Sequence, residues 1–400
     1  MRYILLMVLS LSLFTACTTT VANTPTSIPT QPPPTSISPT ATPLPTPTLT
    51  PSLPTPTLTL EWGIAFAAVS PEMTTGPGPV WSLSLYLIHR DGSGLTPLTG
   101  EMEYITNLTA SPDGRHLLFA AYREDTDGDG FAGSIDLPHL SIVSVQTGEV
   151  FTLTSGSISM EQVAAWSPDG ERIVFASSEV NANNRVHITE SHTYLYVINR
   201  DGTGKMKLTH QEGWICATTW SPTGERIAFE QNGAVWIVNS DGSGLSKVAD
   251  TVAGAASCTA RPVWSPDGSR IAFVAPGMEG KQDIFVANAD GAGLYNLTAD
   301  PFMNCDPTWS PDGQFVAFVR EGELYIIDIN ANIVKPVFYS PERGAGFPTW
   351  SPDASQIVFI SPSHETWKEA LVIANLADNS IQELHDNVWD RPAWVLMPTR

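Results

Sequence analysis

A five-residue sequence, Trp-Ser-Pro-Asp-Gly, recurs along the chain and constrains its fold more than any other feature. Copies begin at Trp166, Trp220, Trp264, Trp309 and Trp350, and a copy without the tryptophan begins at Ala110. Thr223 replaces the aspartate of one copy, and Ala354 replaces the glycine of another. A repeat of roughly 40–45 residues is the length of one four-stranded blade of a β-propeller.

The residues around each copy predict antiparallel strands joined by tight turns. In Pro-Asp-Gly the proline fixes φ, the aspartate bonds to nearby backbone, and the glycine accepts a positive φ. An alternating apolar segment follows each copy, as at 172–175, which is typical of a strand. A third strand then ends in an Asp-Gly hairpin signal. These signals are at Asp91, Asp201, Asp241 and Asp290.

The motif copies and the strands that follow them resemble the TolB-type, WD-repeat-like β-propeller family. Its hallmark is this turn followed by a strand such as Ile-Ala-Phe, which occurs here at 227–229. The resemblance covers about residues 60–397 and implies an all-β propeller. For function it implies binding of a protein at the channel mouth, although the same scaffold is also attached to unrelated enzymes.

The two ends of the repeat region are incomplete in complementary ways, which predicts the number of blades. Residues 391–394 echo 261–264 and form a seventh inner strand with no second strand after it. Residues 62–66 match a second strand with no inner strand before it. We therefore predict seven blades, with the last strand completing the first blade and closing the ring. Six or eight blades are the alternatives.

The first residues indicate export. Arg2 precedes an apolar run at 4–14, which has the length of a signal-peptide core and is too short to span a membrane. The run ends before Cys17 in a sequence that resembles a bacterial lipobox. We expect residues 1–17 to be a lipoprotein signal peptide, with Cys17 as the lipidated residue; an ordinary signal peptide with a chance cysteine is the alternative. The protein would then face the periplasm or the cell exterior, and only its lipid would enter the membrane.

Residues 18–60 contain no charged side chain and are rich in threonine and proline. Such a segment cannot bury a core, and frequent proline disfavours helix and sheet. We expect an extended stalk, bare or O-glycosylated, before a propeller domain at 61–400. The chain has 20 basic and 41 acidic residues, a net charge of −21. This charge repels phosphate backbones and argues against nucleic-acid binding.

An acidic segment fits the spacing of a 12-residue calcium loop. Carboxylates stand at loop positions 1, 3, 5 and 12, glycine at 6, and a residue that would contribute its carbonyl at 7. The five candidate ligands are Asp125, Asp127, Asp129, Phe131 and Asp136. Aspartate at position 12 is shorter than the usual glutamate. A solvated acidic loop without calcium is the alternative.

Three cysteines lie shortly before the inner-strand tryptophans of consecutive repeats, namely Cys216, Cys258 and Cys305. Exported proteins form disulfides. Two pairings are open, Cys258 with Cys305 and Cys216 with Cys258, and either leaves one thiol over. The three cysteines could instead be free thiols in the core or the ligands of a three-thiolate metal site.

The motif turns are uniform, whereas the loops on the opposite face vary in length, near 69–81, 123–137, 179–193, 276–281 and 361–368. Varied loops on a rigid scaffold are where binding residues concentrate. We expect the binding face there and at the entries to the inner strands. The candidate residues are Asn107, His187, His192, Arg261, Asp306, His364 and Arg391.

No catalytic motif stands out in the sequence. It contains no Gly-x-Ser-x-Gly, no His-Glu-x-x-His and no phosphate-cradling glycine loop. We therefore expect a non-catalytic module of the cell envelope that binds a protein or another ligand. A propeller enzyme acting on a polysaccharide or peptide in the channel is the second hypothesis, and a structural spacer is the third.

Overall fold

The computed structural model describes residues 60–398, except for 70–81, 123–138, 155–162, 179–192, 252–260, 278–279 and 364–367. The chain divides into two units, Met1–Thr57 and Leu58–Arg400, and every described strand belongs to the second. Within the described residues no helix has the length and apolar character needed to span a membrane.

The repeated motif forms the turn between the first two strands of a blade. In one copy the Ser167 hydroxyl donates a hydrogen bond to the Asp169 carboxylate at 2.5 Å and accepts one from the Arg172 N–H at 2.9 Å. The Gly170 N–H donates to the Ser167 carbonyl at 2.9 Å, with Gly170 at a φ of 71°. The side chains of the motif thus satisfy the backbone groups that the tight turn exposes.

The described strands form seven blades, each named here from its innermost strand outward. Blade 1 contains β28 (Ala393–Pro398), β1 (Leu60–Val69), β2 (Ser82–His89) and β3 (Thr96–Pro97). Blade 2 contains β4 (Met102–Ala110), β5 (His116–Tyr122), β6 (His139–Ser144) and β7 (Val150–Thr152). Blade 3 contains β8 (Ala164–Trp166), β9 (Arg172–Ser178), β10 (Thr193–Asn199) and β11 (Met206–Lys207). Blade 4 contains β12 (Ile215–Trp220), β13 (Arg226–Gln231), β14 (Ala234–Asn239) and β15 (Ser246–Asp250).

The remaining three blades have the same antiparallel order. Blade 5 contains β16 (Val263–Trp264), β17 (Arg270–Pro276), β18 (Gln282–Asn288) and β19 (Tyr295–Asn296). Blade 6 contains β20 (Asn304–Trp309), β21 (Phe315–Arg320), β22 (Glu323–Asp328) and β23 (Ile333–Phe338). Blade 7 contains β24 (Gly346–Trp350), β25 (Gln356–Pro362), β26 (Glu369–Asn375) and β27 (Ile381–Asp386). The fold is the predicted all-β, seven-bladed propeller, and not one of six or eight blades.

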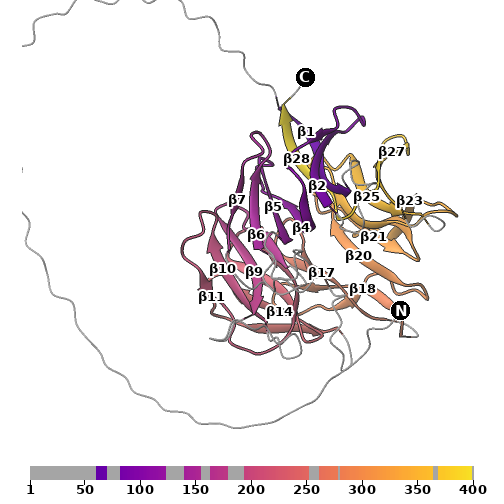
Figure 1. Cartoon of the computed structure of the whole chain (residues 1–400). Helices are drawn as coiled ribbons and strands as arrows, with labels where there is room; N and C mark the ends of the chain where they lie inside the picture. The colour runs from indigo at the N-terminus through magenta and orange to yellow at the C-terminus, as the bar shows by residue number, and fades with distance from the viewer. Residues whose placement is uncertain are drawn as a thin grey trace, which may run out of the picture. The chain divides into compact units, whose positions relative to one another are not determined.

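The ring closes as the two incomplete ends of the repeat predicted. Strand β28 pairs with β1 in antiparallel register, with Trp394 opposite Ile64 and Pro398 opposite Leu60. Figure 1 shows the yellow β28 beside the indigo β1. Blade 1 is therefore built from both ends of the domain, and β28 covers the inner edge that β1 would otherwise expose.

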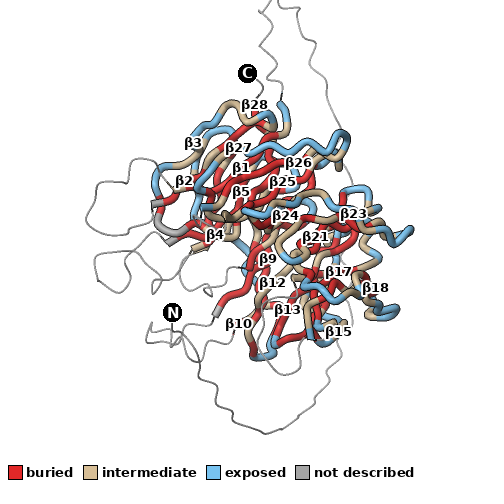
Figure 2. The backbone as a smooth tube through the Cα atoms, turned by 90° about the vertical axis from the view of Figure 1, so that its right-hand side faces the viewer, coloured by how far each residue is buried: buried red, intermediate tan, exposed pale blue. Residues whose placement is uncertain are grey.

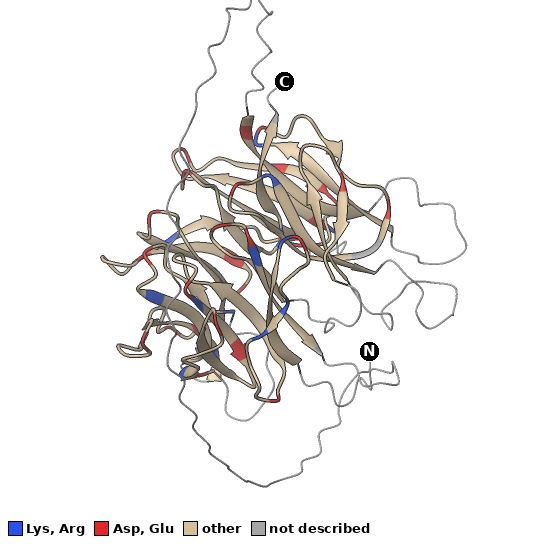
Figure 3. Ribbon diagram, turned by 90° about the vertical axis from the view of Figure 1, so that its left-hand side faces the viewer, with Lys and Arg blue, Asp and Glu red and all other residues tan. Residues whose placement is uncertain are grey.

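The core includes the second strand of every blade, together with much of the third strands and the inner-strand tryptophans. One phenylalanine from each of these strands is at most 1% exposed, at positions Phe66, Phe119, Phe175, Phe229, Phe273, Phe318 and Phe359. Figure 2 shows the buried strand interiors in red and the exposed turns in pale blue. Acidic residues are spread over many of these turns and strand ends (Figure 3).

The motif tryptophans join neighbouring blades. Each indole N–H donates a hydrogen bond to a backbone carbonyl on the innermost strand of the preceding blade, at 3.2–3.4 Å. The six donors are Trp166, Trp220, Trp264, Trp309, Trp350 and Trp394. The seam between blades 1 and 2 has Ala110 at the equivalent position. There β2 pairs directly with β4, and the Leu396 N–H donates to the Gly114 carbonyl at 2.8 Å.

Candidate functional site

One position on the innermost strand of each blade, or just before that strand, lines a central cavity. It lies three residues before the motif tryptophan, or before Ala110 in blade 2. Its occupants in chain order are Asn107, Val163, Ala217, Arg261, Asp306, Phe347 and Arg391. The cavity has a volume of about 880 Å³, within the range of pockets that hold small molecules. We call these seven residues the cavity ring.

The cavity ring is chemically lopsided. Val163 and Ala217 come from the adjacent blades 3 and 4 and make one side of the ring small and apolar. The other five residues come from blades 5, 6, 7, 1 and 2 in unbroken succession and carry charged, aromatic or amide side chains. A ligand in this cavity would therefore meet nearly all of the ring's polar groups on one side.

The backbone of the cavity ring is held in an uncommon conformation in four blades. The φ angles are 57° at Asn107, 38° at Arg261, 50° at Asp306 and 52° at Phe347. In blades 2, 6 and 7 the pairing register shifts around the same residue. Such bulges re-aim a side chain, and positive φ is unfavourable for residues other than glycine. Strain of this kind gathers at binding and catalytic sites.

Arg261 and Asp306 form an ion pair across blades 5 and 6. The Arg261 Nη1 atom donates to Asp306 Oδ1 at 3.0 Å, and these side chains are 37% and 19% exposed. The second oxygen of Asp306 accepts the Phe347 N–H at 3.4 Å. Both oxygens of Asp306 are therefore hydrogen-bonded, one to Arg261 of blade 5 and the other to the backbone of blade 7.

Phe347 brings two guanidinium groups together. The Arg261 guanidinium carbon lies 4.9 Å from the centre of its ring, and that of Arg391 lies 5.5 Å away. Cations near an aromatic face are attracted by its quadrupole, by about 0.5–2 kcal/mol. One phenylalanine therefore supports two positive charges at one side of the cavity.

Arg391 differs from Arg261 because the protein gives it no ion pair within the described residues. Its Nε atom is buried and has no hydrogen-bond partner there. Burial lowers the pKa of Arg391, and the charge of Arg261 acts in the same direction. Asp390 and Asp306 offset part of this effect. Its positive charge is therefore balanced through space by Asp390 and Asp306, without a direct ion pair among the described residues.

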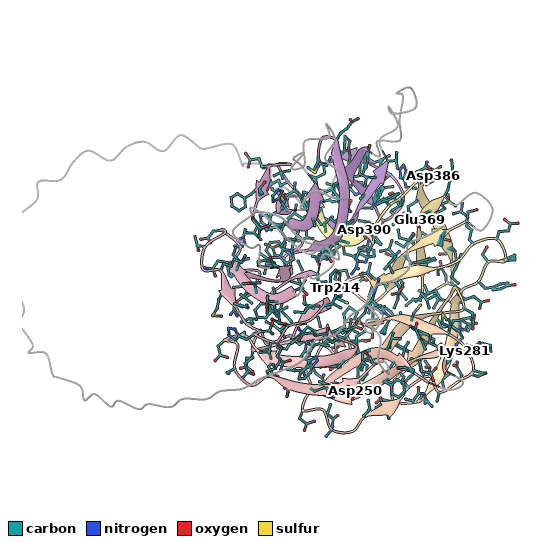
Figure 4. The ribbon with its side chains drawn as sticks, turned by 60° about the horizontal axis from the view of Figure 1, so that its bottom comes forward. Trp214, Asp250, Lys281, Glu369, Asp386 and Asp390 are labelled. Atoms are coloured by element: carbon teal, nitrogen blue, oxygen red, sulfur yellow. The ribbon has the colours of Figure 1, made fainter. Side chains whose placement is uncertain are left out.

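Asp390 also lines the cavity and ties blade 1 to blade 2. Its Oδ2 atom accepts the Leu108 N–H at 3.0 Å. Burial raises the pKa of the neighbouring Glu369, and the charge of Asp390 raises it further. Figure 4 labels both residues. Asn107, on the same strand as Leu108, donates from its amide to the Ala164 carbonyl at 3.2 Å.

The structure brings together four of the seven residues that the sequence proposed for the binding face. Asn107, Arg261, Asp306 and Arg391 all line the cavity. His187, His192 and His364 lie outside the described residues. The same is true of Cys17 and of the calcium-loop candidates Asp125, Asp127, Asp129, Phe131 and Asp136. Within the described part of the chain, no cluster of three or more His, Cys, Asp or Glu residues is arranged to hold a metal ion.

One of the two disulfide pairings is contradicted. Cys305 is a free thiol, so the pairing of Cys258 with Cys305 is wrong. Burial, with a smaller contribution from the charge of Asp306, raises the pKa of Cys305 to about 12. Cys216 is disulfide-bonded. That bond also excludes the three-thiolate metal site.

Sequence reasoning missed Phe347, Asp390 and the apolar pair Val163 and Ala217. A signal for three of them was present, because they stand at the same distance before the motif tryptophan as Arg261 does. Aligning the repeats at that position, without regard to residue type, identifies the whole cavity ring. Asp390 lies one residue before the ring position and has no such signal.

Three solved structures illustrate the similarity of the fold. TolB from Acinetobacter baumannii is 16% identical, with a TM-score of 0.50, over 83% of this chain and 66% of that one. A puromycin-hydrolysing peptidase from Mycobacterium tuberculosis is 12% identical, with a TM-score of 0.60, over 83% of this chain and 54% of that one. An oligogalacturonate lyase from Vibrio parahaemolyticus is 14% identical, with a TM-score of 0.52, over 82% and 85%.

At these identities the similarity shows the fold alone. The chain spans just under two thirds of the TolB structure and about half of the peptidase. None of the curated protein sequences is significantly similar to the chain. The family model of the TolB beta propeller domain matches residues 180–395, which is more than half of the chain. Together with the seven blades built on the repeated turn, this match shows that the chain belongs to the TolB β-propeller family.

Proposed function

We propose that this protein is a non-catalytic binding module of the bacterial cell envelope, and that it holds its ligand in the central cavity. The observation that carries the proposal is the cavity ring. At one structurally equivalent position, seven blades present seven side chains of which only the two arginines are alike, and four of them are held at positive φ. Scaffold positions of the same strands repeat one residue type, so this variation points to recognition.

The chemistry of the lining favours binding over catalysis. Apart from the disulfide-bonded Cys216, the ionisable side chains among the described lining residues are Arg261, Asp306, Asp390 and Arg391. Both carboxylates already accept backbone N–H groups, at 3.4 and 3.0 Å. Guanidinium groups remain protonated and do not act as general bases. The described lining therefore orients and holds a ligand better than it transfers protons.

One observation favours the alternative, an enzyme acting on a polysaccharide or peptide in the channel. Glu369 has a raised pKa beside Asp390, as a general acid requires. Glu369 is not among the residues that line the cavity, however, and so would need a route to the substrate. Fold-level likeness to a lyase and a peptidase adds nothing to this alternative beyond the shared scaffold.

As a module of the envelope, the propeller would lie outside the cytoplasm, anchored by a lipid on Cys17 and separated from the membrane by the 18–60 stalk. In this setting the 125–136 segment would bind calcium, which would order a long loop whose carboxylates otherwise repel one another. Metabolic labelling with a palmitate analogue tests the anchor. The Cys17→Ala variant should lose the label and leave the membrane fraction.

A ligand panel tests the central claim. Sugars, sugar acids, amino acids and short peptides are screened by thermal shift on the full chain and on an Asn107→Ala, Arg261→Gln, Arg391→Gln variant. We expect at least one compound to raise the melting temperature of the parent but not of the variant, and mass spectrometry to recover it unchanged. A compound that is converted to product would support the enzyme. A panel in which every stabilising compound acts equally on both proteins would overturn the cavity as the binding site.

A further inference from the structure

Arg391 is the charged side chain of the cavity whose hydrogen-bonding capacity the described protein leaves open; the hydroxyls of Thr106 and Thr218, which also line the cavity, have no partner among the described residues either. Arg391 lines the cavity, stacks on Phe347 at 5.5 Å and makes no ion pair with a described residue. Its buried Nε has no acceptor among those residues. Arg391 is half-buried, and a guanidinium nitrogen removed from water without an acceptor is costly, so this group beside a pocket points to an anion that completes its hydrogen bonding.

The carboxylates nearby are committed elsewhere. Asp306 gives one oxygen to Arg261 at 3.0 Å and the other to the Phe347 N–H at 3.4 Å. Asp390 accepts the Leu108 N–H at 3.0 Å. Donor capacity remains on Arg391 and on the guanidinium nitrogens of Arg261 that do not face Asp306, beside acceptor capacity on the second oxygen of Asp390. The site therefore suits a ligand that accepts hydrogen bonds and carries negative charge.

Threonine hydroxyls supply the second part of the site. Four lining threonines lie one residue before the tryptophan position of their blades and are half-buried, namely Thr109, Thr219, Thr308 and Thr349. Their carbonyls accept the indole N–H of the next blade at 3.2–3.4 Å. Hydroxyls both donate and accept, so they match a ligand that itself bears several hydroxyl groups.

From these observations we infer that the cavity binds a small sugar acid, with its carboxylate held by Arg391 and Arg261 beside Phe347 and its hydroxyls facing the threonines. The inference rests on the proposed function and specifies its ligand class. A planar carboxylate matches the fork of a guanidinium group, which favours it over a spherical anion. The volume of about 880 Å³ accommodates a sugar acid of one or a few residues.

The test compares D-glucuronate with D-glucuronamide, which keeps the ring and hydroxyls but has no charge. Binding to the full chain is measured by calorimetry and by ligand-observed NMR at up to 50 mM, about the weakest range in which a specific site is distinguishable. We expect glucuronate to bind about tenfold to a hundredfold more tightly, as charge-assisted hydrogen bonds predict. The Arg391→Gln variant should reduce this preference to within about twofold.

Two further variants distinguish a loss of ligand preference from a loss of folding. Arg391→Lys keeps the charge without the fork and should retain part of the preference. Arg200→Gln removes an arginine whose guanidinium lies 3.8 Å from Glu171 and which does not line the cavity, and it should retain the full preference. Each variant is measured at the same interval below its own melting temperature.

Three outcomes overturn the inference: no detectable glucuronate binding, equal affinity for the amide, or phosphate binding as tightly as glucuronate with the same dependence on Arg391. In each case the proposed function still stands if the panel contains another ligand that the cavity variant loses. If the panel also contains no ligand that the cavity variant loses, both the inference and the proposed function are wrong.

Discussion

Two positions three residues apart, both on the innermost strand of a blade or at its entry, have opposite characters. The tryptophan position holds the same side chain in six of seven blades, buried and bonded to the preceding blade at 3.2–3.4 Å. The cavity-ring position holds six residue types among its seven occupants and is strained in four. The comparison shows that one strand can serve the scaffold and the site separately, because adjacent pleats and bulges send their side chains to different places.

The deletion of residues 388–400 should have the largest effect, because it removes both positions of blade 1 at once. Strand β28, Arg391 and Trp394 are lost, and β1 is left as an open edge. We expect loss of the cooperative thermal transition, or aggregation, in circular dichroism and light scattering. A truncated protein that melts at the parent's temperature would show that the ring does not depend on its closing strand.

Trp309→Ala should lower the stability of the fold, because it changes the tryptophan position and leaves the cavity ring intact. The side chain is 7% exposed, and removing a buried tryptophan costs about 3–5 kcal/mol of unfolding free energy. Trp309→Phe keeps most of the packing but loses the bond to the Val263 carbonyl, at about 1 kcal/mol. Urea unfolding measures both. Equal losses in the two variants would mean that the hydrogen bond, and not the packing, carries the seam.

The double variant Arg261→Gln, Arg391→Gln should lose ligand binding and keep most of its stability. The Arg261–Asp306 pair is partly exposed and Arg391 has no ion pair with a described residue, so we expect unfolding free energy to change by no more than about 1 kcal/mol. Ligand binding in the cavity should be lost. A large fall in stability together with the loss of binding would assign these arginines to the scaffold.

Ala354→Gly should relieve backbone strain in the scaffold, because Ala354 stands at the glycine position of the repeated motif. Ala354 has a φ of 57°, where glycine stands at φ of 66–71° in the other copies. A left-handed conformation costs an L-residue about 1–2 kcal/mol, so the variant should gain about 1 kcal/mol after the extra chain entropy of glycine is subtracted. The unfolding free energy is measured with urea. A variant less stable than the parent would contradict this prediction.

The motif aspartates should give a small stability loss at low pH. Hydrogen bonds from the Ser265 hydroxyl and the Ser269 N–H lower the pKa of Asp267 to about 2, from 3.8. Its contribution to stability is therefore complete above pH 3.8 and is lost as pH falls through about 2. Asp267→Asn should be less stable than the parent at pH 7 and equal to it near pH 2. A constant difference between the two proteins in acid-dependent melts would contradict this assignment.

The scaffold was predictable from the sequence because it repeats. The motif fixes the turn, the period fixes the blade, and the unmatched strands at 62–66 and 391–394 identify the closure. The site was predictable only in part, because its residues vary by nature. Asn107, Arg261, Asp306 and Arg391 were found by their polarity, whereas Phe347 was overlooked because an aromatic residue in a strand is usually core.

The pairing of Cys258 with Cys305 failed for a related reason. The three cysteines stand at similar positions in consecutive sequence repeats, but spacing alone does not decide between two partners. The contact between the Arg261–Asp306 pair and Phe347 joins three blades and has no local sequence signature. Such contacts depend on the curvature of the ring, so they are identified only from the three-dimensional structure.

The closure of blade 1 also determines when the cavity comes into existence. Strand β1 is made first and β28 last, and Arg391 arrives together with that final strand. A chain that lacks β28 would have neither the sealed ring nor Arg391. The pairing of strands so distant in sequence is slow to form. On the proposed function, a ligand could then be held only after β28 has paired with β1.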